Sequence, residues 1–140
     1  LEVELPFLQT VLSNFTLLPI VVGDAEPTTV SNILEILWGN DETLIVISSD
    51  LSHFLEYEAA CQRDQITCKS IENMSIELIN DGDACGKNPI NGLLVSARKH
   101  KLSISTLCLG NSGDTAGDKK CVVGYGSWLF TDKKLCSLEA

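Results

Sequence analysis

The sequence contains no apolar run close to the roughly 20 residues that a helix needs to cross a bilayer. Its start, Leu1–Glu4, also lacks basic residues, so we expect neither a membrane-spanning segment nor a secretory signal peptide. Basic residues are scarce throughout: 10 lysines and arginines stand against 19 aspartates and glutamates, and the net charge is -9. Nucleic acids and anionic membranes are bound by clustered lysine and arginine, so neither is an expected partner.

Paired cysteine motifs are absent too, because none of the six cysteines forms a C-x-x-C pair. Cys61 and Cys68 lie in a helical pattern and Cys108 lies in an apolar run, where free cysteine packs as a small hydrophobic residue. A core of this size does not need disulfides to be stable. We therefore expect a reduced, cytoplasmic protein rather than one held by three disulfides.

Two common catalytic motifs are missing. No G-x-S-x-G sequence occurs, which weakens the case for a serine hydrolase. Gly110–Asp114 is rich in glycine but lacks the lysine and the serine or threonine of a phosphate-binding loop. His100 ends a basic helical stretch, and we expect it to be solvated.

What the chain does contain is an alternation of helical and strand-like segments. Its 140 residues are 44% hydrophobic and 21% charged, as in an ordinary globular domain. Alternating strands and helices indicate a layered α/β fold. The expected helices are 2–13, about 27–38, about 57–79 with a break near Asn73, and about 89–101; the expected strands are Phe15–Val22, Thr43–Ile47, Leu102–Leu109 and Cys121–Phe130, with an exposed tail from Thr131.

The stretch Ser48–His53 follows the strand-like run Thr43–Ile47 directly. In open α/β sheets, sites form in the crevice outside the carboxyl ends of the strands. His53 could act there as a general base or metal ligand, with Asp50 tuning or orienting it. The alternative is a polar loop in which Asp50 caps the following turn and His53 has no role, and spacing alone leaves both interpretations open.

Cys85 stands between Ala84 and Gly86, shortly before Pro89 at the start of an expected helix. A helix N-terminus favours the thiolate form, so Cys85 could be a metal ligand or a nucleophile. Alternatively, it is a small residue that packs into a turn.

Several stretches, taken together and in order, resemble the Memo-like proteins, known in bacteria and archaea as AmmeMemoRadiSam system protein B. Leu1–Phe7 resembles the end of their H-S-x-E-x-x-L-P-[FY] motif, and Ser48–His53 resembles their S-S-D-x-x-H motif. Ala84–Ile90 resembles their C-G-[RK]-x-P-I motif, and Asn111–Gly126 resembles a polar loop that leads into a closing V-x-Y-[AG] strand. The resemblance covers essentially the whole chain as far as Phe130.

That family is similar to the class III extradiol dioxygenases, which are non-haem iron enzymes. The resemblance implies an α/β fold with a mixed central sheet flanked by helices. It also implies that His53 is the acid/base histidine, that Asp50 is its neighbour, and that Cys85 replaces a carboxylate metal ligand. A thiolate shifts metal preference towards softer ions such as copper, although iron also fits, so dioxygenase activity does not follow from the resemblance.

Members of the family are about twice this length, and two of their metal-ligating histidines fall outside this sequence. By the resemblance, residues 1–130 are the C-terminal half of a Memo-like domain and residues 131–140 are a tail. We therefore expect an iron or copper ion in the longer protein, none tightly bound by this fragment, and no catalysis by the fragment alone. Exposed sheet edges could also lead to homo-oligomers.

Two other functions stay open. One is a binding module that holds a small molecule, a peptide or a small anion without chemistry. The other is a structural or dimerisation half-domain, in which His53 and Cys85 affect nothing beyond stability.

Overall fold

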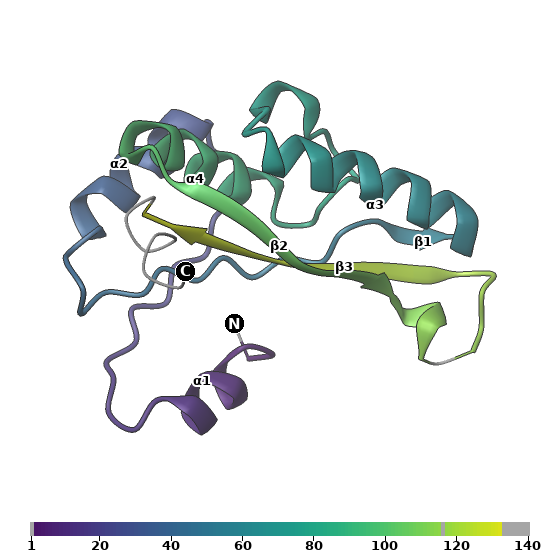
Figure 1. The fold of residues 1–140 in the computed structure, drawn as a ribbon, viewed down its shortest axis with the longest axis horizontal. Coiled ribbons are helices and arrows are strands. Elements are labelled where there is room, and N and C mark those ends of the chain that lie inside the picture. The colour runs from purple at the N-terminus through teal and green to yellow at the C-terminus, as the bar shows by residue number, and fades with distance from the viewer. Residues whose placement is uncertain (1, 116, 133–140) are drawn as a thin grey trace, which may run out of the picture.

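The computed structural model describes residues 2–115 and 117–132 (Figure 1). Of the expected tail, only Thr131 and Asp132 lie inside the described residues. The elements in chain order are α1 (Leu5–Val11), α2 (Pro27–Leu37), β1 (His53–Leu55), α3 (Tyr57–Glu72), η1 (Ile76–Leu78), α4 (Lys87–His100), β2 (Ser103–Asn111), η2 (Ser112–Asp114) and β3 (Val122–Thr131).

The strands form one sheet in the order β1-β3-β2. Both pairings among the described residues are antiparallel: β2 and β3 form a long hairpin, and β1 pairs with the start of β3. Helix α3 packs on β2 and β3, while α4 packs on α2 (Figure 1). The α/β composition is confirmed, but the part of the chain that the structure describes contains an antiparallel sheet and not a mixed one.

Three of the expected helices are confirmed, and their sequences explain their ends. Pro27 begins α2 and is tolerated in a first helical turn because its missing N–H has no partner there. Helix α3 ends at Glu72, next to the predicted break at Asn73. Helix α4 ends where Lys101 adopts a left-handed conformation with φ 57°, which closes the helix through backbone N–H bonds to Ala97 and Arg98.

The apolar residues of these helices supply the core. One cluster joins the loop before β1 to α3 and α4, and a second joins α2 to α4. The first contains Leu51, Ile71, Ile79, Ala84, Ile90 and Leu94, and the second contains Val30, Leu34 and Leu93. No helix among the described residues is long and apolar enough to span a membrane.

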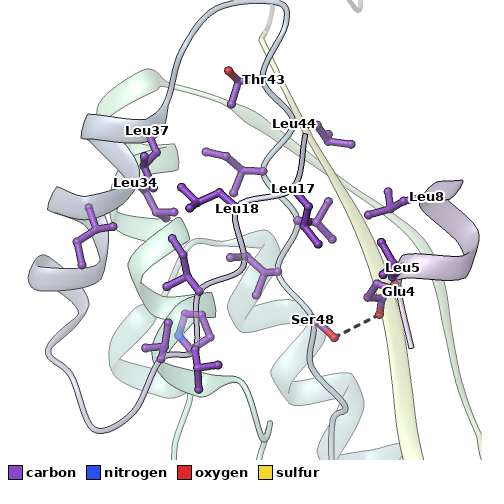
Figure 2. Close-up of a pocket in the computed structure, with 18 of the residues that line it drawn as sticks. Glu4, Leu5, Leu8, Leu17, Leu18, Leu34, Leu37, Thr43, Leu44 and Ser48 are labelled. Atoms are coloured by element: carbon purple, nitrogen blue, oxygen red, sulfur yellow. Dashed lines mark hydrogen bonds between the residues drawn. The ribbon is translucent and has the colours of Figure 1, made fainter. Parts of the chain in front are cut away.

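Two expected strands are wrong. Phe15–Val22 and Thr43–Ile47 run without strand pairing, and many of their apolar side chains are exposed (Figure 2). Val21, for example, is 91% exposed. A strand is defined by its partner, and none of the described residues pairs with either segment.

Two smaller expectations also need correction. Helix α1 spans Leu5–Val11 and not 2–13, and it has no buried residue, so little packing extends it. The short strand β1 was not expected, because three residues are too few to show a period of two.

His100 is not a freely solvated side chain, contrary to expectation. Its ring stacks on Trp38 with the two ring centroids 4.0 Å apart and the planes 2° from parallel. Its Nε2 atom lies 2.9 Å from Oε2 of Glu35, and its side chain is 33% exposed. These contacts join the C-terminal end of α4 to α2.

The contacts of Glu35 make the stability of the fold depend on pH. Hydrogen bonds from the Ser96 hydroxyl and, secondarily, from His100 lower the pKa of Glu35 below its usual value of 4.5. A carboxyl with a lowered pKa in the folded state contributes stability above its unfolded pKa, and the contribution is lost as pH falls through the folded value. We expect Glu35→Gln to flatten the fall in the free energy of unfolding below about pH 4.5, as measured by urea unfolding at several pH values. Asp41→Asn, which alters an exposed loop acid, is the control and should leave that fall unchanged.

Candidate metal centre

The segment that carries Asp50 and His53 is fixed to strand β3. The backbone N–H of Leu51 donates to the carbonyl of Gly124, and the N–H of Gly124 donates to the carbonyl of Ser52, both at 2.8 Å. His53 then begins β1, opposite Val123. Asp50 and His53 are therefore held on either side of a hydrogen-bonded anchor and not on a free loop.

Cys85 is fixed to the same segment by reciprocal bonds. Its N–H donates to the carbonyl of Asp50, and its Sγ accepts from the N–H of Asp50, each at 3.1 Å. The N–H of Gly86 donates to Oγ of Ser49 at 2.8 Å. A Cβ on Gly86 would lie 2.7 Å from Cβ of Ser49, so glycine lets the two segments approach this closely.

These contacts bring three side chains with metal-ligating atoms together. One such atom from each of Asp50, His53 and Cys85 lies within 4.8 Å of the others. Nε2 of His53 is 3.5 Å from Oδ2 of Asp50, and the two side chains are 36% and 48% exposed, so solutes can reach them. The side chains singled out in the sequence are thus neighbours in the fold, while their roles stay predictions.

The arrangement fits a metal ion on two observations. Nε2 of His53 is shielded from solvent, and beyond the 3.5 Å ion-pair contact with Asp50 it has no hydrogen-bond partner among the described residues, which is costly for a polar atom that binds nothing. Two ligand atoms about 2.1 Å from a tetrahedral ion are about 3.4 Å apart, close to the separation of this nitrogen and the carboxylate oxygen. A nitrogen, oxygen and sulfur donor set suits zinc, iron or copper.

Ser49 belongs to the site, although sequence reasoning missed its role. Its Oγ lies 3.6 Å from Sγ of Cys85 and 2.7 Å from the carbonyl of Asp50. A hydroxyl has one proton, so Ser49 can donate either to that carbonyl or to the sulfur. It can therefore support a thiolate without any movement of the backbone.

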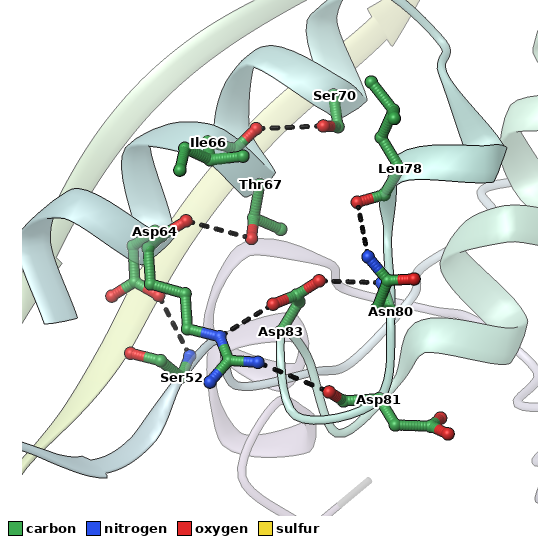
Figure 3. Close-up of polar contacts among 10 residues, drawn as sticks. Ser52, Asp64, Ile66, Thr67, Ser70, Leu78, Asn80, Asp81 and Asp83 are labelled. Carbon is green, nitrogen blue, oxygen red and sulfur yellow. Dashed lines mark hydrogen bonds and ion pairs between the residues drawn. The ribbon is translucent and has the colours of Figure 1, made fainter. Parts of the chain in front are cut away.

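Asp64 is a second residue that sequence reasoning missed. It is 2% exposed, and its Oδ1 accepts from the N–H of Ser52 at 3.0 Å (Figure 3). It lies on the buried face of α3 with Ala60, Thr67 and Ile71, at helical spacing. An acid at an apolar-face position was the available signal, and it indicates a buried partner for that acid.

The loop that carries Cys85 is tied to α3 by an ionic contact. Nε of Arg63 lies 2.7 Å from Oδ1 of Asp83, whose Oδ2 accepts from the N–H of Asn80 at 2.7 Å (Figure 3). Arg63 also donates to the carbonyl of Asp81 at 3.4 Å. The turn at 80–83 thus holds its shape and its distance from α3.

The glycine-rich stretch Gly110–Asp114 has a structural role. Oδ1 of Asn111 accepts from the N–H of Gly113 at 2.9 Å, and Oδ2 of Asp114 accepts from the N–H of Asn111 at 2.8 Å. Oδ1 of Asp114 accepts from the Tyr57 hydroxyl at 2.7 Å, which raises the pKa of Tyr57 to about 12. These side chains therefore stabilise the turn between β2 and β3.

Fold and site together define a small α/β protein with a candidate Asp–His–Cys metal site. The chain belongs to the Memo-like protein family, whose family model matches residues 1–129, and the resemblance seen in the motifs is confirmed. It is 32% identical over 144 residues to a MEMO1 family protein of Metallosphaera sedula, covering 94% of this chain and 51% of that protein. It is 36% identical over 140 residues to a MEMO1 family protein of Methanosarcina mazei, covering 91% and 52%. The chain spans about half the length of the curated relatives it matches.

Proposed function

We propose that this chain contributes Asp50, His53 and Cys85 to the metal site of a Memo-like protein with redox or oxygen chemistry. The observation that supports it most directly is the meeting of these three side chains around Nε2 of His53, which is shielded from solvent and hydrogen-bonded to none of the described residues. Bound iron or copper would supply redox chemistry, and the relation to non-haem iron extradiol dioxygenases belongs to the same proposal. On this proposal the described free thiols favour a reducing, cytoplasmic setting.

The three residues have distinct tasks in this proposal. Cys85 binds the metal, and the N–H of Asp50 stabilises its thiolate. Nε2 of His53 is a second donor and an oxygen of Asp50, 3.5 Å away, is a third, and the imidazole can carry a proton when it does not bind metal. Three donors leave coordination positions for further ligands, so the chain alone should bind metal weakly and catalyse nothing.

Replacing His53 by alanine tests the proposal. We expect His53→Ala to weaken binding of Cu⁺ or Zn²⁺ by ~10-fold or more, because it removes one of three donors. Affinity is measured by competition with a chromophoric chelator under reducing conditions. His100→Gln is the control: it alters the other histidine, on α4, and should leave affinity unchanged. Equal affinity of His53→Ala and the unaltered chain would contradict the proposal.

The second candidate is a binding module without chemistry. A groove of about 1620 Å³ beside Cys85 favours it. The groove lining among the described residues carries the acids Glu4, Asp41 and Glu42 and no basic residue, so it suits a peptide better than a small anion. Binding of a peptide that persists in excess chelator would support this alternative.

A further inference from the structure

Phe54, the residue after His53, has a backbone conformation that a phenylalanine rarely adopts. Its φ angle is 60°, in the left-handed region that disfavours residues with a bulky side chain. It is also the extra residue of a β-bulge. His53 pairs with Val123 and Leu55 pairs with Val122, so β1 has one residue more than β3 over this interval. Such bulges occur next to functional sites, where they re-aim a side chain.

The conformation of Phe54 brings its ring to the imidazole of His53. Successive side chains of a regular strand point to opposite faces of the sheet, so rings at adjacent positions do not normally meet. Here the two ring centroids are 5.6 Å apart and the ring planes are tilted by 55°, which is the geometry of an aromatic pair. The bulge therefore turns two neighbours in sequence into a ring contact.

Burial does not explain why Phe54 is held in this way. The residue is 76% exposed, so its ring gains little from leaving water. Within the part of the chain that the structure describes, the aromatic partner of this ring is His53. Sparsely populated backbone conformations cluster at functional sites, where the strain belongs to the function. The effect of the ring on His53 therefore accounts for the arrangement better than core packing does.

The ring contact restricts the imidazole within the candidate metal centre. Asp50, His53 and Cys85 each offer one ligand atom within 4.8 Å of the others, and Nε2 of His53 is 3.5 Å from Oδ2 of Asp50. A histidine side chain has three staggered χ1 rotamers, and a change of χ1 would carry Nε2 away from this position. The Phe54 ring stabilises the observed rotamer, because the other rotamers would lose the ring contact.

We propose that Phe54 is a positioning residue that holds the His53 imidazole in the rotamer facing Asp50 and Cys85. The consequence for metal affinity rests on the proposed function, whereas the consequence for the rotamer does not. When only a fraction of the molecules has the competent rotamer, the apparent affinity is reduced by that fraction. Release of the imidazole into three equally populated rotamers would thus weaken metal binding about threefold.

The first measurement is made with chelator present, so it does not depend on metal binding. NMR records the side-chain three-bond couplings and the ring proton shifts of His53. We expect one dominant χ1 rotamer in the unaltered chain and averaged couplings in Phe54→Gly, because glycine suits the φ angle but removes the ring. Phe54→Tyr keeps a ring and should restore the single rotamer. His100 stacks on Trp38 and should give the same signals in every variant.

The second measurement is competition for Cu⁺ with a chromophoric chelator under reducing conditions. Phe54→Gly should bind Cu⁺ about threefold more weakly than the unaltered chain, and Phe54→Tyr should bind it equally well. Lys101→Gly is the matched control: Lys101 is also exposed and left-handed, with φ 57°, but lies at the opposite end of α4 from Cys85. It should leave affinity unchanged. Phe54→Asn, which also tolerates this φ angle, takes the place of Phe54→Gly if circular dichroism shows that the glycine variant loses its helices.

Three results would overturn the proposal. The first is a His53 rotamer distribution that is the same in Phe54→Gly as in the unaltered chain, since the ring would then not restrict the imidazole. The second is averaging in Phe54→Tyr as strong as in Phe54→Gly. The third is unchanged Cu⁺ affinity in Phe54→Gly, since the rotamer would then not matter to the site. If the unaltered chain bound no Cu⁺ while its rotamer still depended on Phe54, the metal proposal would fail and the positioning role would stand.

Discussion

Gly124→Ala is expected to destabilise the fold by about 2–5 kcal/mol. A Cβ at this position would lie 1.9 Å from Oδ2 and 2.6 Å from Cγ of Asp64. The carboxylate cannot move away cheaply, because it is 2% exposed and accepts from the N–H of Ser52 at 3.0 Å. Strand β3 cannot move either without breaking two 2.8 Å hydrogen bonds, one that the N–H of Leu51 donates to Gly124 and one that the N–H of Gly124 donates to Ser52.

Urea unfolding measures this loss, and Gly23→Ala is the matched control. A Cβ on Gly23 meets no atom of the described residues within 4 Å, so that change should alter the free energy of unfolding by less than about 0.5 kcal/mol. If both variants were equally stable, β3 and α3 would not be packed as closely as the structure places them. The double change Gly124→Ala with Asp64→Ala should cost less than the sum of the single changes, because both act on one contact.

The parts of the fold that could be predicted from sequence are those that local patterns specify. Helices α2, α3 and α4 and the hairpin of β2 and β3 follow from local patterns: apolar spacing, Pro27 at a helix start, and alternating or apolar runs. The turn at 81–83, between η1 and α4, has an equally local cause, because aspartate and glycine are residues that turns favour. Each of these signals lies within a few residues of the structure that it specifies.

The strand predictions failed where a strand depends on pairing with a second segment. Phe15–Val22 and Thr43–Ile47 have the composition of strands, yet composition cannot supply the second strand that a ladder needs. The short strand β1 contains Phe54 at φ 60°, an uncommon conformation for a residue other than glycine, and its register with β3 is irregular. Neither feature leaves a periodic signal in the sequence.

The candidate site also combines residues that the sequence could identify with residues that only the fold reveals. Asp50, His53 and Cys85 were found because their residue types carry metal and proton chemistry and because the motifs resemble one family. Ser49 and Asp64 were missed because their partners are distant in sequence: Ser49 bonds to a residue 37 positions away and Asp64 to one 12 positions away. Supporting residues are defined by such contacts, and only the fold reveals them.

Cys85→Ser is expected to lower metal affinity by at least ~100-fold. Loss of an outer partner of a metal ligand costs about 10–100-fold, so loss of the ligand itself should cost at least as much as the upper end of that range. Serine preserves the size of the side chain but replaces a soft sulfur with a hydroxyl, which binds copper and zinc poorly at neutral pH. The measurement is competition with a chromophoric chelator for Cu⁺, supported by loss of the thiolate-to-metal charge-transfer absorption with Co²⁺.

Cys121→Ser is the control, because Cys121 is another exposed free thiol, outside the candidate site. If the control lost as much affinity as Cys85→Ser, the metal would be binding to surface thiols in general. If neither variant lost affinity, Asp50 and His53 would hold the ion without sulfur, and a hard ion such as Mn²⁺ would become the better candidate. The charge-transfer absorption separates these outcomes, because it reports sulfur bound to the metal and not the protein's stability. A Cys85→Ser variant that kept its helices but lost both the absorption and the affinity would therefore assign the thiolate as a ligand in this chain.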